Sequence, residues 1–115
     1  MKRFLVTHLT PSHVIDGWKK TEPGKRKTEE LKMQADWKAW MGDHINMFAD
    51  TGAGVGRTKR VTSRGTADAR NDVLLYAVVE ANSHEAASRE FESHPHLRIP
   101  QSSIEVMEIV PLQGM

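Results

Sequence analysis

The stretch VLLYAVVEANSHEAASREFE, residues 73–92, decides the fold of this chain because a strand pattern runs directly into a helix start. Residues 73–81 are mostly β-branched, aliphatic or aromatic, a composition that indicates a strand. Asn82 or Ser83 can then cap a helix, since a short polar side chain satisfies free backbone N–H groups at a helix start. A further strand pattern follows over residues 102–110. We therefore predict a strand, a helix and a strand in this half of the chain.

The first half of the chain predicts a second unit of the same kind. We expect a strand over residues 3–9, helices from Thr10 to about residue 48 that are interrupted at TEPGKRK, and a strand over RTKRVTS, residues 57–63. The glycine-rich stretch 51–56 is expected to be a loop, and residues 64–72 a polar turn. The order βαββαβ predicts one ferredoxin-like α+β domain over residues 1–115, with an antiparallel sheet and helices on one face.

Strand alternation predicts which side chains lie on the open face of the sheet, away from the helices. Phe4, Val6 and His8 share one face of the first strand. We expect four polar or titratable side chains on the open face: His8, Tyr76, Glu80 and Glu105. Apolar neighbours make this face too hydrophobic to be left in water. A second copy of the chain would cover it most simply, so we predict a homodimer in which two sheets close an α+β barrel.

Composition excludes several classes of protein. The 115 residues hold 16 Lys+Arg against 15 Asp+Glu, which gives no general attraction to nucleic acid or to an anionic membrane. The absence of cysteine excludes disulfides, iron–sulfur clusters and thiolate zinc sites. No stretch has the length of a transmembrane helix or a signal peptide, so we expect a cytoplasmic protein. The TGAGVG loop fits neither nucleotide-binding glycine pattern, and we expect no cofactor.

Three stretches resemble a known family: GRTKRV at 56–61, RND with YAVVEANSHEAASREFESHPHLRIP at 70–100, and IEVMEIVPL at 104–112. They are similar to the YCII-related group of the dimeric α+β barrel superfamily. The resemblance implies two ferredoxin-like sheets packed face to face, with a cavity in each half of the barrel. Relatives of this kind include muconolactone-type isomerases, cofactor-independent oxygenases, a dehydrochlorinase and haem-handling proteins. YCII-like proteins have been proposed to use a histidine–aspartate pair. This chain has ARND near the hairpin where those proteins have a DGPF stretch, so the resemblance supports the fold more than it supports that pair.

The stretch HPHLRIP, residues 94–100, holds two histidines separated by one proline. Three interpretations stay open from the sequence. His94 and His96 could clamp a metal, although a divalent site generally needs a third protein ligand. They could instead form a stiff corner, with His94 capping the end of the preceding helix. They could also act in acid/base chemistry, because imidazole titrates near neutral pH.

We expect a small-molecule enzyme that uses general acid/base chemistry in the barrel cavity, an isomerase, a lyase or a cofactor-free oxygenase acting on a small cyclic or phenolic acid. His94 or His96 would move the proton and Glu80 would be the partner base. Arg60 would hold the anionic substrate, because a guanidinium binds a carboxylate through two bonds. His8, Tyr76 and Glu105 would complete the site, which needs no metal.

A non-catalytic alternative is a metabolite-binding or regulatory homodimer. In that case Glu80 and Glu105 would pair with Arg57, Lys59 or Arg60 and make the open face an ionic dimer interface. The two functions predict different geometry. An enzyme predicts a histidine and a carboxylate within hydrogen-bond reach in an open cavity, whereas the alternative predicts a filled interior or histidines bonded to backbone groups.

Overall fold

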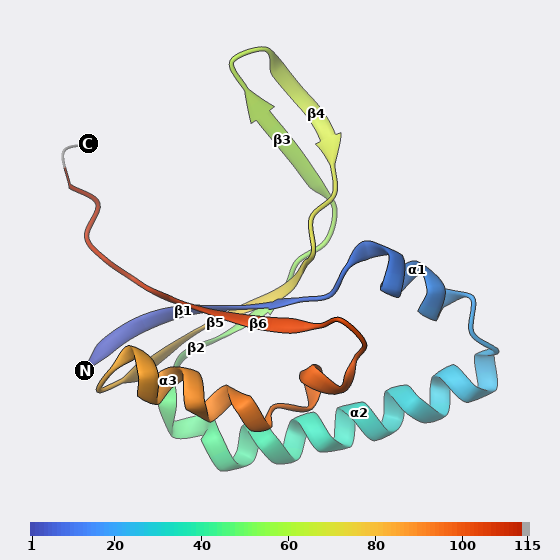
Figure 1. Ribbon diagram of the computed structural model, residues 1–115, viewed down its shortest axis with the longest axis horizontal. Coiled ribbons are helices and arrows are strands. Elements are labelled where there is room, and N and C mark those ends of the chain that lie inside the picture. The colour runs from blue at the N-terminus through green and yellow to red at the C-terminus, as the bar shows by residue number, and fades with distance from the viewer. Residues whose placement is uncertain (114–115) are drawn as a thin grey trace.

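The computed structural model describes residues 1–113, which form an α+β fold with one main sheet, a separate hairpin and three α-helices (Figure 1). The strands of the main sheet are β1 (Lys2–Leu9), β2 (Phe48–Gly54), β5 (Val73–Ala81) and β6 (Ser103–Glu108). The hairpin consists of β3 (Thr58–Thr62) and β4 (Gly65–Ala69). The helices are α1 (Ser12–Lys19), α2 (Pro23–His44) and α3 (His84–Glu90), with short 3-10 turns η1 (Ile45–Met47), η2 (Phe91–Ser93) and η3 (Pro95–Arg98).

The main sheet has the order β2-β5-β1-β6, and every neighbouring pair is antiparallel. In the two central strands and β6, Val6 lies opposite Ala77 on one side and Val106 on the other. Helices α2 and α3 cover one face of this sheet, while no layer of the described chain covers the opposite face (Figure 1). Residues 73–81 form β5 as the sequence predicts, and Ser83 caps α3 by accepting a hydrogen bond from the Ala86 backbone N–H.

The hydrophobic core lies between the sheet and the two covering helices. Phe4 and Val6 of β1 are fully buried there, packed with a group of apolar side chains from the sheet and helices: Trp40, Val79, Ala87 and Phe91. His8 follows Phe4 and Val6 along the same face of β1, so it too lies under the helices. The prediction that His8 lies on the open face is therefore wrong. A central strand is apolar on both faces, and alternation alone cannot tell which face the helices cover.

The second strand of the sheet is β2, not the predicted strand over residues 57–63. The glycines that suggest a loop instead let β2 bend across β5, with shifts in register after Phe48 and Asp50. Gly52 has φ +75°, and a Cβ built on it would lie 1.6 Å from the Tyr76 carbonyl oxygen. The Asp50 carboxylate accepts a hydrogen bond from the Gly52 N–H at 2.8 Å and supports this close approach. Only glycine fits at position 52 without moving β5.

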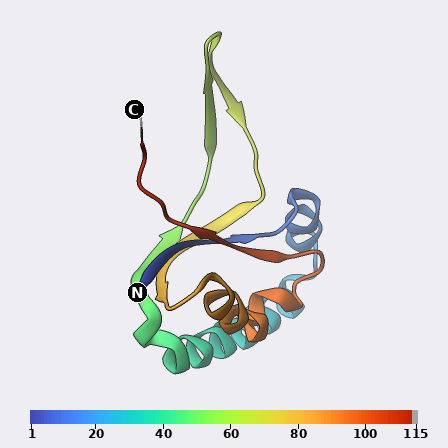
Figure 2. The same cartoon turned by 60° about the vertical axis from the view of Figure 1, so that its left-hand side comes forward.

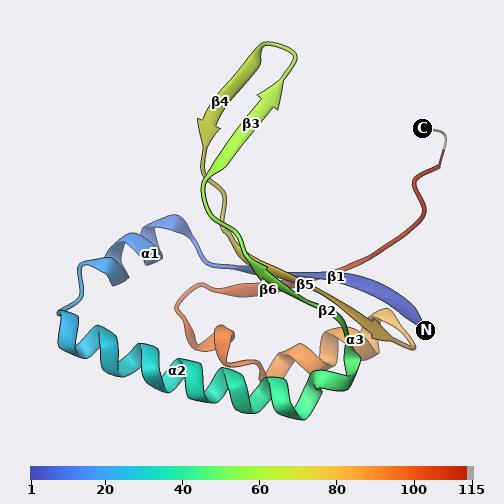
Figure 3. The same ribbon diagram turned by 180° about the vertical axis from the view of Figure 1, so that it is seen from behind.

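Residues 57–70 form an arm, the β3–β4 hairpin with its base, that stands away from the rest of the chain. Figures 2 and 3 show the arm and the extended segment after β6 leaving the sheet on the side opposite the helices. Nearly every arm residue is exposed, and Val61 is 75% exposed. The predicted polar turn over residues 64–72 is thus mostly strand β4. In the described residues, no helix is long and apolar enough to cross a membrane.

Candidate functional site

Three histidines that lie far apart in the sequence meet beneath the sheet. His8 comes from β1, while His94 and His96 flank Pro95 where the chain turns from α3 toward β6. The ring centroid of His8 lies 4.7 Å from that of His94 and 4.9 Å from that of His96, and both pairs meet edge to face. All three side chains are buried, His8 at 3% and His96 at 1% exposure. We call these three residues the histidine cluster.

Backbone groups hold two members of the histidine cluster in place. The His96 Nε2–H donates to the Leu9 carbonyl oxygen at 3.0 Å, which ties η3 to the end of β1. His94 Nδ1 accepts from the His96 backbone N–H at 3.0 Å, so the neutral His94 ring carries its proton on Nε2. His8 differs, because its Nδ1 is buried and has no hydrogen-bond partner in the described residues. The HPHLRIP stretch is therefore a corner whose histidines bond to the backbone.

Burial keeps the histidine cluster uncharged. Loss of solvation, together with the nearby His94 and His96 rings, lowers the pKa of His8 from 6.5 to about 3. Burial, with His96 and His44 nearby, lowers the pKa of His94 to about 4. Burial also lowers the pKa of His96, although its hydrogen bonds to the backbone of Leu9 and Ser103 oppose the shift. All three imidazoles are neutral at pH 7.

Aromatic side chains of α2 enclose the histidine cluster. Trp37 stacks on His8 at a centroid distance of 5.2 Å and meets His94 edge-on at 4.3 Å. Trp40 lies 4.5 Å from His94 and donates its indole N–H to the Ser93 hydroxyl at 3.0 Å. These contacts are those of a close-packed interior, in which aromatic rings meet in offset and edge-to-face arrangements.

The carboxylate expected to work with these histidines lies on the other side of the sheet. Glu80 pairs across the sheet with Arg3, on the face opposite Phe4 and Val79, and lies 4.0 Å from the Arg3 guanidinium. Tyr76 and Glu105 both lie opposite Thr7 and share that open face. The structure therefore brings His8, His94 and His96 together but separates them from Glu80, Tyr76 and Glu105 by the thickness of the sheet.

The remaining predicted residue, Arg60, lies on the arm and is also remote from the histidine cluster. Among residues 1–113, no three His, Asp or Glu side chains are arranged to hold a metal ion. His94 and His96 direct ring nitrogens at backbone groups, as described above, so their lone pairs do not converge. In the part of the chain that the structure describes, no predicted histidine has a predicted carboxylate or guanidinium beside it.

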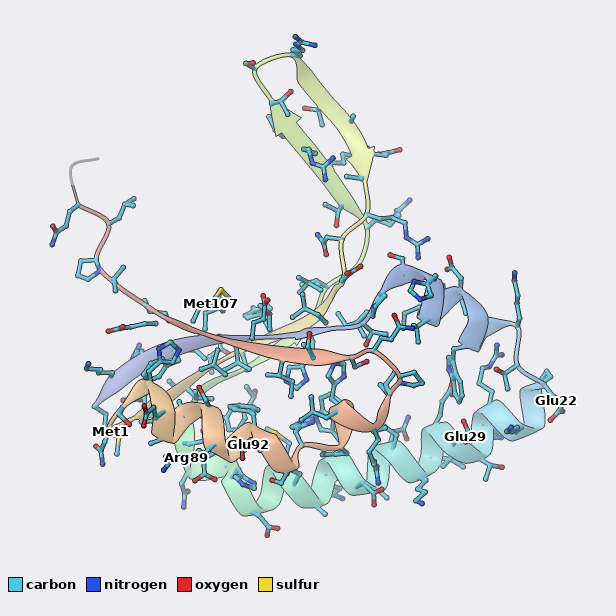
Figure 4. The ribbon with its side chains drawn as sticks, viewed as in Figure 1. Met1, Glu22, Glu29, Arg89, Glu92 and Met107 are labelled. Atoms are coloured by element: carbon cyan, nitrogen blue, oxygen red, sulfur yellow. The ribbon has the colours of Figure 1, made fainter. Side chains whose placement is uncertain are left out.

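An apolar cleft of about 540 Å³ lies between α1, α2 and the turn that follows η3. Its walls are mainly aliphatic and aromatic: Val14, Ile15 and Trp18 from α1, Met33 from α2, and Ile99 and Pro100 from the turn. Arg98 lines the same cleft, but its guanidinium is engaged by the Asp36 carboxylate at 2.7 Å. Glu29 and Glu30 also line the cleft, and Glu29 lies where α2 passes beneath α1 (Figure 4).

Helix α1 forms one wall of the cleft without being packed into the core. It has no fully buried residue. Three polar contacts hold it. The Asp16 carboxylate accepts two hydrogen bonds from Arg70, at 3.1 and 3.2 Å, the Trp18 indole N–H donates to Glu30 at 3.4 Å, and the Lys19 carbonyl oxygen accepts from the Arg26 side chain at 2.9 Å. The hydrogen bonds from Arg70 also lower the pKa of Asp16. An apolar space closed by a lightly packed helix can admit a molecule without unfolding the core.

The sequence analysis did not identify this cleft. Its one available signal was the apolar stripe of α1, which is too short and too lightly packed to serve the core. A comparison with models of protein families gives no match for this chain, and neither does a comparison with curated proteins.

Proposed function

We propose that this protein is a small-molecule-binding homodimer, and that the apolar cleft between α1 and α2 is its ligand site. The cleft carries the proposal, because its volume and apolar lining fall in the range of small-molecule sites, about 300–1,000 Å³. The histidine cluster supports it indirectly. Two of its histidines, His94 and His96, bond to backbone groups, and none of the three has a carboxylate partner in the described residues, which is the geometry expected of the non-catalytic alternative.

The side chains of the cleft favour a ligand with an apolar, ring-sized body and a neutral or cationic polar end. Trp18 and Met33 offer an indole face and a polarisable sulfur to an aromatic ring. Glu29 places negative charge at the cleft. Arg26 pairs with Glu30 at 3.9 Å, and Asp36 neutralises Arg98, the one cation among the described residues that line the cleft. An anionic ligand would meet net negative potential there, so anions should bind more weakly.

Two fluorescent probes of similar ring size test the ligand class. We expect 1-aminoanthracene, which is uncharged at pH 7.5, to bind once per chain. We expect 1-anilinonaphthalene-8-sulfonate, which carries one negative charge, to bind at least about tenfold more weakly, a difference of about 1.4 kcal/mol. Fluorescence titration of the purified protein measures both dissociation constants.

A variant that fills the cleft provides the control. Ile99→Trp places an indole in the cleft and should abolish 1-aminoanthracene binding. Val110→Trp adds the same ring to an exposed residue outside the cleft and should leave the dissociation constant unchanged. Binding that survives Ile99→Trp, with folding verified by circular dichroism, would contradict the proposed site.

The proposal of a dimer rests on the solvent-accessible area that one chain leaves exposed. The described chain exposes 8379 Å², whereas a compact monomer of 13.0 kDa should expose about 6,300 Å². Its radius of gyration is 16.3 Å, against about 13 Å for a compact domain of this length. The excess area of about 2,000 Å² exceeds the roughly 800 Å² per partner of a standard stable interface.

The open sheet face contributes apolar side chains to this exposed surface. Met107 points away from the helices (Figure 4) and is 39% exposed, and Leu5 and Val78 share its face. We infer that two such faces pack together and form a dimeric α+β barrel of the YCII-related kind. The strand order β2-β5-β1-β6 supports this, because it is the order that a ferredoxin-like split βαβ sheet requires.

Acid/base catalysis is a second candidate function, and His8 supports it. Its buried Nδ1 has no hydrogen-bond partner in the described residues, and an unpaired buried polar atom costs about 1–3 kcal/mol. Such a cost is often retained at functional sites. A small enolisable or phenolic acid that reached His8 could give up or receive a proton there.

Proton exchange tests this second candidate. Lactones, phenols and keto acids incubated with the protein in D₂O would exchange carbon-bound hydrogen for deuterium, read as loss of ¹H NMR intensity. Catalysis predicts faster exchange with the wild type than with His8→Phe, which keeps the aromatic packing but has no proton acceptor. Equal exchange rates in both proteins would exclude His8 as the acid/base group for these compounds.

A further inference from the structure

The arm is a hairpin that its own subunit does not support. An isolated two-stranded hairpin is marginally stable in water at best, so a protruding one needs a partner to be ordered. Both flanking strands return to the main sheet, and Asn71 at the arm base donates to the Thr58 hydroxyl at 3.4 Å. Beyond this base, the ribbon has no neighbour in the described chain (Figures 2 and 3).

The two faces of the arm differ in chemistry. On one face Lys59 lies opposite Asp68, and the two form an ion pair at 2.7 Å. On the other face Arg60 lies opposite Ala67, and its neighbours on that face are small: Thr58, Thr62, Gly65 and Ala69. A flat face of small residues allows close approach of another surface, and Arg60 is its only charge.

Charge complementarity points to the open sheet face as the surface that the arm contacts. Residues 57–69 contain four cationic side chains and one carboxylate. The open face carries Glu80, which pairs with Arg3, and Glu105, which makes no ion pair in the described residues. Arg60 makes none either. The small-residue face of the arm and the open sheet face thus carry charges of opposite sign, Arg60 and Glu105, that make no ion pair within the described chain.

Strand geometry lets Arg60 reach a facing sheet. The chain leaves the main sheet at Gly54, so the stretch from Gly54 to Arg60 can span up to about 20 Å when extended. Sheets that pack face to face lie about 10 Å apart. An arm that leaves one sheet on its open side is therefore long enough to bring Arg60 alongside the sheet packed against it.

We propose that in the homodimer each arm lies along the β6 edge of its partner's open sheet face, beside the packed sheets, and that Arg60 pairs with Glu105 of the partner subunit. Two-fold symmetry produces this contact twice, because each subunit provides one arm and one acidic face. The inference rests on the dimer of the proposed function, but not on ligand binding in the cleft. It assigns the excess exposed area of each chain to one self-complementary interface.

Sedimentation equilibrium of the full chain tests the arm with four variants. Arg60→Glu should weaken the dimer at least about tenfold, because it places like charges together. The double variant Arg60→Glu/Glu105→Arg should recover most of the lost dimer affinity. Lys59→Ala, on the opposite face of the arm, should change the dimer dissociation constant less than threefold. A fourth variant, with an Asn-Gly turn replacing residues 59–68, removes the ribbon and should give monomers at 10 µM.

Each outcome of this experiment decides between specific claims. A wild type that is monomeric at 100 µM would contradict the dimer itself. A dimer that the Asn-Gly variant leaves intact would keep the dimer and overturn the role of the arm. Failure of the double variant to restore association would overturn the pairing of Arg60 with Glu105. The Asn-Gly variant also tests whether the arm binds nucleic acid. If the wild type binds duplex DNA at 150 mM salt, and the Asn-Gly variant remains a dimer but no longer binds DNA, the arm contacts nucleic acid and not the partner subunit.

Discussion

Lowering the pH from 7.5 to 5.5 should reduce the free energy of unfolding by about 3 kcal/mol. The pKa of His8, His94 and His96 is lowered in the folded state, so the unfolded chain binds more protons at mildly acid pH. The stabilising contribution of these histidines is then fully present above the ordinary histidine pKa of 6.5. It decreases as the pH drops toward the pKa values of the folded state, about 3 for His8 and about 4 for His94. His8 and His94 each contribute a slope of about 1.4 kcal/mol per pH unit in that window, and His96 acts in the same direction.

Urea unfolding at a series of pH values measures this slope. His8→Phe should reduce the loss between pH 7.5 and 5.5 by about 1.4 kcal/mol, because one protonation site disappears from the unfolded state. His13→Gln removes an exposed histidine of α1 and should leave the slope unchanged. The carboxyl groups with lowered pKa, Asp16 and Glu22, act on stability at lower pH and stay outside the window. A wild type equally stable at pH 5.5 and 7.5 would mean that the histidine cluster is solvated and not buried.

Replacing His96 with alanine should lower the free energy of unfolding at pH 7.5 by about 3–5 kcal/mol. His96 is among the largest fully buried side chains, so its removal leaves a cavity next to His8 and Trp37. It also leaves the Leu9 carbonyl without the hydrogen bond from Nε2, at a further cost of about 1–3 kcal/mol. These costs do not add fully, because the corner can relax once η3 is released from β1.

Leu97→Ala is the matched control for this prediction. Leu97 is the next residue in η3 and is 39% exposed, so its truncation should cost less than about 1 kcal/mol. Urea unfolding at pH 7.5, with the slope of the transition compared between variants, measures both changes. A His96→Ala protein as stable as Leu97→Ala would indicate that the HPHLRIP corner does not hold the fold together.

The sequence predicts a strand well where the apolar pattern is long and is bounded by turn or capping residues. The predicted strand over residues 73–81 and the predicted helix after Ser83 are confirmed, because the apolar strand pattern ends directly before a capping residue. The face of β1 is wrong because a central strand is apolar on both sides, and only tertiary packing decides that Phe4, Val6 and His8 face the helices. That single inversion separates His8 from Tyr76 and Glu105, with which the sequence analysis grouped it.

Strand β2 and the arm could not be predicted from the sequence, because their local chemistry resembles that of other elements. Glycines such as Gly52 suggest a loop, whereas here they allow a bent strand to approach the Tyr76 carbonyl closely. Residues 57–63 have the composition of a strand, which predicts a place in the main sheet, but they form the first half of the arm, where both faces of the hairpin are exposed to solvent in one chain. The cleft depends on how α1 settles against α2, which no local pattern encodes.

Chemical-shift mapping tests the central claim, that the cleft binds a small molecule, most directly. ¹H–¹⁵N spectra of the labelled protein, titrated with 1-aminoanthracene at pH 7.5, follow each backbone amide and the three indole N–H groups. We predict saturable shifts at Val14, the Trp18 indole, Met33 and Ile99, which line the cleft. Saturable shifts confined to Leu5, Val78 and Met107 on the open face, or the absence of saturable shifts, would contradict the account.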